Sequence, residues 1–192
     1  ETALIKMKTE PRMFKAVIDR ITKFYLEANE IFYKAAAKKL DAVLIGNDFG
    51  SQTGLMVDPD SLRKFVLPGT RKLVEQAKSF DLKVIHHSCG SIYEIIPDLI
   101  EIGIDAIHPI QALAKNMAAE KLKKDFGDQI SFCGGVDAQN LLVKGTPDQV
   151  KDRVLKLKEI FPTGLIISPS YEAILPDISP ANIEALFTAM RS

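Results

Sequence analysis

The feature that most constrains the fold of this chain is a regular alternation of short apolar segments and longer amphipathic ones. Apolar runs rich in β-branched residues lie near 42–47, 83–88, 106–109, 130–134 and 165–169. Segments with helical spacing separate them. Short runs that are apolar on both faces and separated by helices are typical of parallel strands joined by crossover helices. The sequence therefore predicts an α/β protein with five parallel strands, each followed by a helix.

Start and stop signals bound the predicted helices. The first helix is predicted over residues 11–40, and Pro68 is expected to interrupt the second. Gly103 and Gly127 are expected to end two others. A capping residue followed by proline starts a helix at each of three places, Asp58–Pro59, Thr146–Pro147 and Ser179–Pro180.

Polar side chains follow directly after the predicted strands. In a β/α barrel the C-terminal strand ends share one rim, and in a doubly wound sheet they share one edge. The absence of a GxGxxG motif after the first strand gives nucleotide binding little support. We therefore predict a (β/α)8 TIM-barrel type of fold. The polar residues concerned are Asn47, Asp48, His87, Cys89, His108, Asp137, Gln139, Ser168, Ser170 and Tyr171.

Five strands are fewer than the eight that close such a barrel. Residues 1–192 are therefore predicted to form a single domain, the C-terminal part of a larger barrel, and the start at Glu1 is interpreted as a cut or processed end. An open sheet exposes unpaired backbone groups at its edges. The expected partner is the missing N-terminal half or a second copy of the chain.

Composition narrows the function classes. Lys and Arg together number 25, as do Asp and Glu, so charge does not favour nucleic-acid or membrane partners. The longest apolar stretch falls short of the ~18 residues of a membrane span. Two distant cysteines do not form a disulfide framework, which favours a reducing, cytoplasmic location.

Several motifs resemble the uroporphyrinogen decarboxylase superfamily, over nearly the whole chain from about Glu10 to Met190. The resemblance implies a (β/α)8 barrel and one of two chemistries. One branch decarboxylates the acetate side chains of uroporphyrinogen without a cofactor, in porphyrin biosynthesis. The other uses zinc to move a methyl group between a corrinoid, carried by a partner protein, and a thiol-type acceptor. The motifs are "NDFGSQTGLMVDP", "HHSCGS", "IPDLIEIGIDAIHPIQ", "LKKDFGDQISFCGGVDAQ", "GTPDQV" and "PDISPANIEAL".

The "HSCG" segment is similar to the H-x-C pair of the zinc branch. His87 and Cys89 are two residues apart, so on a strand they point to the same face. Imidazole and thiolate are both good zinc ligands. His86 points the opposite way and is interpreted as structural. The alternative for His87 and Cys89 is a polar strand end that holds no ion.

A catalytic zinc site needs about three protein ligands. The resemblance implies a cysteine after the last strand, and Tyr171 stands in that place. The decarboxylases carry a histidine at about that point, so Tyr171 departs from both branches. We keep Tyr171 as a candidate catalytic residue and name Cys133 or Glu172 as the candidate third metal ligand.

Asp48 is a further candidate catalytic residue, able to bind substrate N–H groups, orient a histidine or complete a metal site. The alternative is a capping role in the turn that follows. Gly50 and Gly54 suggest a loop that closely approaches a ligand. The candidate residues for binding a small-molecule substrate are Gln52, His108, Gln111 and Asp137.

Three functions follow from these observations. The first is a zinc-dependent, corrinoid-linked methyltransferase, with His87 also in a catalytic role. The second is a uroporphyrinogen decarboxylase, disfavoured by "HSCG" and by Tyr171. The third is an inactive binding or assembly module.

Overall fold

The computed structural model describes residues 2–36, 39–171 and 173–191. The chain divides into two compact units. Unit 1 comprises the chain up to Gly46, Leu55–His86 and Glu94–Asp105, and unit 2 comprises Asn47–Gly54, His87–Tyr93 and the chain from Ala106 onward. Among the described helices, none combines the length and the apolar character needed to cross a membrane.

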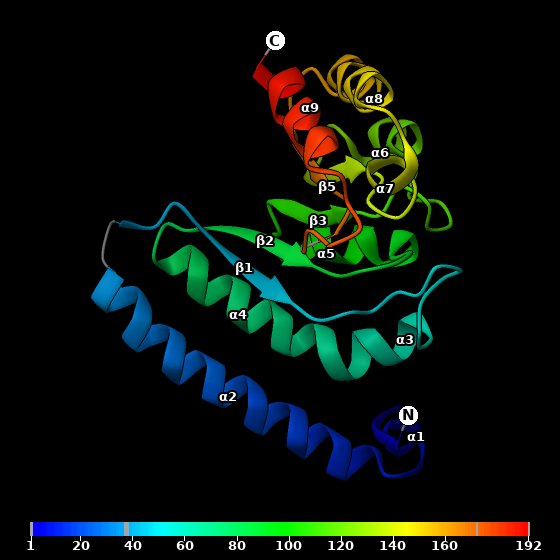
Figure 1. The fold of residues 1–192 in the computed structure, drawn as a ribbon. Coiled ribbons are helices and arrows are strands. Elements are labelled where there is room, and N and C mark those ends of the chain that lie inside the picture. The colour runs from blue at the N-terminus through cyan, green and yellow to red at the C-terminus, as the bar shows by residue number, and fades with distance from the viewer. Residues whose placement is uncertain (1, 37–38, 172, 192) are drawn as a thin grey trace. The chain divides into compact units, whose positions relative to one another are not determined.

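The five predicted strands are all present and parallel, in an α/β arrangement with flanking helices (Figure 1). Their order in the sheet is their order along the chain. Each observed boundary lies within two residues of the predicted one. The strands are β1 (Ala42–Gly46), β2 (Lys83–His87), β3 (Ala106–Ile110), β4 (Ser131–Val136) and β5 (Leu165–Pro169).

In unit 1 the predicted first helix is α2 (Pro11–Ala36). A shorter helix, α1 (Thr2–Thr9), precedes it and was not predicted from the sequence. The second predicted helix is interrupted near Pro68, as expected. A short helix, α3 (Pro59–Ser61), leads into a π-helical turn over Leu62–Val66 and then into α4 (Leu67–Ser79). Proline lacks an N–H and cannot continue the regular ladder, which accounts for the break at this point.

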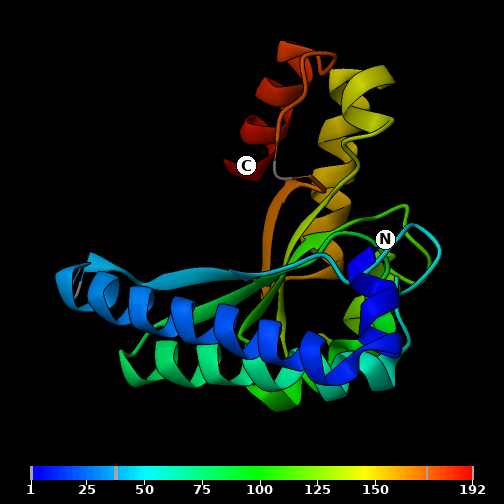
Figure 2. The same cartoon turned by 90° about the horizontal axis from the view of Figure 1, so that it is seen from below.

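Helices α2 and α4 pack side by side, as Figures 1 and 2 both show. Thr22 faces Gly69, where a Cβ atom would lie 2.6 Å from the threonine Oγ1. The side-chain amide of Gln76 donates to the carbonyl of Leu26 at 2.7 Å. An edge-to-face contact between the rings of Tyr33 and Phe80 packs the C-terminal ends of the two helices together. Absence of a side chain at Gly69 thus allows the two helices to approach closely.

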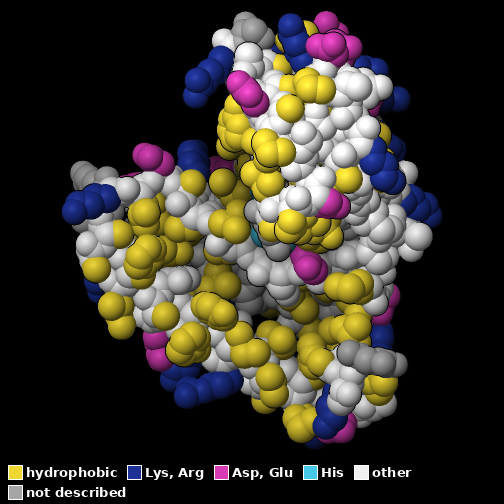
Figure 3. Space-filling view, in the orientation of Figure 1, with side chains coloured by type: hydrophobic (Ala, Val, Ile, Leu, Met, Phe, Trp, Pro, Cys, Tyr) yellow, Lys and Arg dark blue, Asp and Glu magenta, His cyan; other side chains and the backbone are white. Residues whose placement is uncertain are grey.

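The remaining face of α2 carries exposed apolar side chains. Phe24 is 61% exposed and Ile31 is 72% exposed. Met13, Val17 and Ile21 extend the same exposed stripe toward the start of the helix. Hydrophobic side chains accordingly recur at the surface along α2 in Figure 3. Helical spacing predicted the helix, but only part of its apolar surface is buried in unit 1.

We expect the isolated 192-residue chain to self-associate rather than remain a monomer. An apolar stripe of this kind is unfavourable in water, and in a purified sample only another copy can cover it. Analytical ultracentrifugation at micromolar concentration measures this directly. Replacing Phe24 and Ile31 by Lys should shift the sample toward monomer. A monodisperse monomer with a cooperative thermal transition contradicts the expectation.

Unit 2 contains most of the remaining helices. They are α6 (Ala119–Phe126), α7 (Leu141–Lys144), α8 (Pro147–Ile160) and α9 (Pro180–Arg191), and the sequence predicted all but α7. Thr146 caps α8 in a reciprocal capping box with Gln149. Asn182 of α9 donates to the carbonyls of Leu142 and Gly145, which ties α9 to α7.

In unit 1, α5 (Ile96–Ile102) ends at Gly103, as predicted, with a left-handed glycine.

Strand β4 contains two successive glycines just before its last residue, and the first of them, Gly134, packs against β3. Gly134 has φ +112°, and a Cβ there would lie 2.7 Å from the backbone nitrogen of Ile110. The β3–β4 register shifts between Ile107 and Ile110, beside this contact. The absence of a side chain at Gly134 therefore allows the backbones of β3 and β4 to approach closely at this point.

Candidate functional site

The loops that follow β1 and β2 are in direct backbone contact. A Cβ on Gly50 would lie 2.8 Å from the Cys89 carbonyl oxygen, and one on Gly90 would lie 2.5 Å from the Gly50 carbonyl carbon. The amide of Ser91 donates to the carbonyl of Ser51 at 2.7 Å. The close approach expected of the glycine loop is therefore an approach to a neighbouring loop. It brings the residues after the two strands together.

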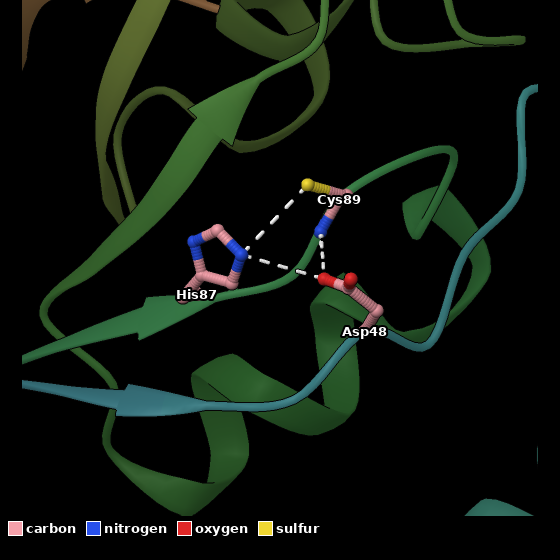
Figure 4. A group of neighbouring side chains, drawn as sticks. All are labelled: Asp48, His87 and Cys89. Atoms are coloured by element: carbon pink, nitrogen blue, oxygen red, sulfur yellow. Dashed lines mark hydrogen bonds and ion pairs between the residues drawn. The ribbon is translucent and has the colours of Figure 1, made fainter. Parts of the chain in front are cut away.

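Asp48, His87 and Cys89 form a cluster at these loops (Figure 4). Nε2 of His87 lies 3.4 Å from Oδ1 of Asp48 and 3.7 Å from Sγ of Cys89. The backbone amide of Cys89 donates to the same Asp48 oxygen at 2.8 Å, which fixes that carboxylate beside the other two groups. A carboxylate, a thiol and an imidazole, all common metal ligands, thus lie next to one another.

The spacing of the three side chains fits a tetrahedral metal site. Zinc bonds of ~2.0–2.3 Å at tetrahedral angles separate the ligand atoms by roughly 3.3–3.6 Å. The two separations from His87 Nε2, 3.4 Å and 3.7 Å, lie close to that range, and the three candidate ligand atoms all lie within 4.8 Å of one another. The Asp48 side chain is 52% exposed and that of His87 is 16% exposed. The cluster is therefore reached from solvent on the Asp48 side.

The strand register follows the alternation expected of β2. Val84 and His86 are fully buried on one face, whereas Ile85 and His87 are partly exposed on the other. His86 thus belongs to the packed face, as its structural interpretation requires. Cys89 lies beyond the strand end, yet its side chain returns to the His87 side.

His108 lies beside His87 in unit 2. The two Nδ1 atoms are 2.9 Å apart, and the ring planes are tilted by 37°. The backbone carbonyl of His108 also accepts the amide hydrogen of Ser88 at 2.8 Å. Sequence reasoning treated His108 as a substrate-binding group and missed this contact, because strand order alone does not give the relative stagger of two strand ends.

Gln111 holds the loops together. It is 4% exposed, and its Oε1 accepts from the Gly90 amide at 2.6 Å and from the side-chain amide of Gln52 at 3.3 Å. The carbonyl of Gln52 in turn accepts from the Lys115 amide at 2.9 Å. These contacts show Gln52 and Gln111 in a bracing role beside the cluster, and their contact with substrate stays a prediction.

Asp137 caps the turn before α7. Its two carboxylate oxygens accept from the amides of Gln139 at 2.8 Å, Asn140 at 3.2 Å and Leu141 at 3.2 Å. Such an arrangement satisfies free N–H groups at a helix start. The capping contacts account for Asp137 without a ligand, and its role in substrate binding stays a prediction.

The structure places the two candidate third ligands differently. Cys133 lies in β4, is 4% exposed, and is not part of the group of ligand-type side chains found in the described residues. Burial raises the pKa of its thiol to about 11, which keeps it protonated at neutral pH. Glu172 lies outside the described residues. Tyr171 follows β5 and is partly exposed. The third side chain beside His87 and Cys89 is instead that of Asp48. Completing a metal site was only one of several roles that the sequence suggested for Asp48.

Comparison with known proteins bears on this arrangement. The sequence profile of the family described as uroporphyrinogen decarboxylase (URO-D) matches residues 1–192. The chain belongs to the URO-D family. This URO-D family chain is 29% identical over 189 residues to the uroporphyrinogen decarboxylase of Chlorobium phaeobacteroides, a match covering 94% of the chain and 49% of that relative.

A second relative of this URO-D family chain has a different activity. This relative is a methylated-thiol–coenzyme M methyltransferase of Methanosarcina mazei. The chain is 27% identical to it over 146 residues, a match that covers 76% of the chain and 36% of that protein. The solved structure of a methyltransferase from Methanosarcina mazei matches with a TM-score of 0.78 at 20% identity, over 98% of this chain and 52% of the other. The fold is thus shared with that structure. The chain spans about half the length of the Chlorobium relative.

Proposed function

We propose that this URO-D family chain carries the metal-binding part of a zinc-dependent methyltransferase. The observation that carries the proposal is the convergence of Asp48, His87 and Cys89, at separations that suit tetrahedral coordination. The similarity to a methyltransferase that acts on methylated thiols supports it. In this proposal Asp48 takes the place of the third ligand.

Each residue of the cluster has a distinct task in this proposal. Cys89 supplies a thiolate and Asp48 a carboxylate, so together they offset the charge of a divalent ion. His87 supplies a neutral nitrogen, and the Cys89 amide holds the Asp48 carboxylate in place. A zinc ion bound here supplies Lewis acidity that keeps an acceptor thiol in its nucleophilic thiolate form.

The exposed side of the cluster suits an incoming small-molecule thiol. Three protein ligands leave a fourth tetrahedral position, which is the arrangement of catalytic rather than structural zinc sites. The half-exposed Asp48 marks the side from which an acceptor enters. As part of the proposal, the methyl group comes from a corrinoid on a partner protein, and the rest of the barrel comes from outside these 192 residues.

Porphyrinogen decarboxylation is the second candidate function. It is favoured by the 29% identity to the Chlorobium decarboxylase over nearly the whole chain. That activity needs no metal, so metal content separates the two candidates. Chain purified without chelators and analysed by elemental mass spectrometry should contain one zinc per chain. Metal-free chain that also fails to take up added zinc contradicts the methyltransferase proposal.

Replacing Asp48 by Asn should weaken zinc binding by about tenfold or more. Loss of a residue that only supports a ligand typically lowers metal affinity by about 10–100-fold, and loss of a ligand's charge should lower it by at least as much. Asparagine retains an oxygen that can accept from the Cys89 amide, so the loop should keep its conformation. Competition with a chromophoric chelator measures the affinity. Asp137→Asn is the matched control, because Asp137 caps α7 and should leave zinc affinity unchanged. Equal affinity of the Asp48 variant and wild type removes Asp48 from the ligand set.

A further inference from the structure

The contact between His87 and His108 joins two ring nitrogens of the same type. Their Nδ1 atoms are 2.9 Å apart, a hydrogen-bond distance. A bond between two imidazole nitrogens needs a hydrogen on one and a bare lone pair on the other. The tautomer of one ring therefore determines the tautomer of the other.

We propose that His108 is a positioning residue that accepts the Nδ1 hydrogen of His87 and so leaves the His87 Nε2 lone pair free to bind a metal ion. This inference rests on the proposed zinc site. A neutral imidazole carries a single ring hydrogen, so a hydrogen held at Nδ1 is absent from Nε2. His108 then carries its own hydrogen on Nε2. Metal-bound histidines commonly donate their second N–H to such an outer partner.

The Asp48 carboxylate makes this partner necessary. Its Oδ1 lies 3.4 Å from His87 Nε2, and an anionic oxygen there favours a hydrogen on that nitrogen. A hydrogen on Nε2 blocks the lone pair that a metal needs. The acceptor at His108 opposes this effect by holding the hydrogen on the other side of the ring. The two contacts compete for one hydrogen, and His108 shifts the balance toward the metal-binding tautomer.

The backbone supports the same role. The His108 carbonyl accepts from the Ser88 amide at 2.8 Å, one residue beyond His87. Backbone and side chain of His108 thus both contact the segment that ends in Cys89. This backbone bond keeps the strand that carries His108 next to the segment that carries His87, which supports an outer partner that orients a ligand.

Two variants at His108 test the inference. Asparagine places an oxygen near the position of the histidine Nδ1 and keeps an acceptor, whereas leucine keeps bulk and has none. His108→Leu should weaken zinc binding by roughly 10–100-fold, and His108→Asn should stay within about threefold of wild type. Chelator competition gives the affinities, and thermal unfolding of each variant shows that it is folded.

Nitrogen-15 NMR of the wild-type chain gives a readout that needs no variant. The chain has only three histidines, so the ring signals are assignable. In the zinc-loaded chain the shared hydrogen should correlate with His87 Nδ1, with a scalar coupling across the bond to His108 Nδ1. A hydrogen found on His108 Nδ1, or equal zinc affinities for the leucine variant and wild type, overturns the role of His108 alone. Failure of the wild type to bind zinc overturns the proposed function as well.

Discussion

Replacing Cys89 by Ser should weaken zinc binding more than about a hundredfold, beyond the 10–100-fold range typical of losing an outer-shell partner. Serine is close to cysteine in size, but its hydroxyl keeps its proton next to a metal ion. A cysteine thiol loses its proton on binding the ion and coordinates it as a thiolate. Cys89 Sγ lies 3.7 Å from His87 Nε2, so its loss removes one corner of the cluster. Chelator competition measures the affinity.

Cobalt substitution makes this result specific for sulfur. A cobalt(II) ion bound by one thiolate gives a sulfur charge-transfer band in the near ultraviolet, and Cys89→Ser should abolish it. Cys133→Ser is the matched control, because Cys133 lies in β4 outside the cluster. Loss of the band in the Cys133 variant, with retention in the Cys89 variant, would falsify the assignment of the sulfur ligand.

Replacing Gly90 by Ala should destabilise the chain by about 2–5 kcal/mol, the sum of backbone strain and steric overlap. Gly90 has φ +79°, and its added Cβ would lie 2.5 Å from the Gly50 carbonyl carbon and 2.6 Å from the Ser51 oxygen. These are backbone atoms, which cannot rotate away as a side chain can. Chemical denaturation followed by circular dichroism measures the loss of stability.

Two further glycines separate the causes. At Gly50 a Cβ meets the backbone of Cys89 and Ser91 at 2.8 Å without a left-handed φ, so Gly50→Ala reports steric overlap, about 1–3 kcal/mol. Gly164 has φ +82° and its nearest contact is the Ser131 hydroxyl at 3.8 Å, so Gly164→Ala reports strain, about 1–2 kcal/mol. If Gly90→Ala costs no more than Gly164→Ala, the two loops are not in the close contact described.

The alternation of apolar runs and helices was enough to predict the five strands seen in the described residues, and their parallel direction. This succeeded because a buried parallel strand is a local property, marked by β-branched residues and bounded by capping signals such as Thr146–Pro147. The short helix α7 was missed. Its four residues, Leu141–Lys144, are too few to show a helical period, and its start is capped by Asp137, which sequence reasoning assigned to substrate.

The candidate site was predicted less completely than the fold. His87 and Cys89 were paired as candidate ligands from their two-residue spacing and from the resemblance of "HSCG" to an H-x-C motif. Their side chains do lie together, although β2 ends at His87, and their role as ligands stays a prediction. The positions of Asp48 and His108 beside His87 were not predicted. They depend on how far one strand end extends past the next, which no local sequence pattern encodes. Gly50 and Gly90 were the one available signal, since a glycine after each of two strands permits their loops to touch.

The interlocked loops also set a rule for protein engineering. Gly50 and Gly90 leave no room for a side chain on either partner, and Gln111 accepts hydrogen bonds from both loops. Transplanting only "HSCG" into another barrel therefore moves the two proposed ligands, His87 and Cys89, without the neighbouring loop that holds them in place. The transferable part is composite: the stretch from Asn47 to Gly54, the stretch from His87 to Tyr93, and the glutamine that follows the third strand. A graft that contains all three parts should keep the arrangement of the cluster, whereas a graft that contains only one or two of them should lose it.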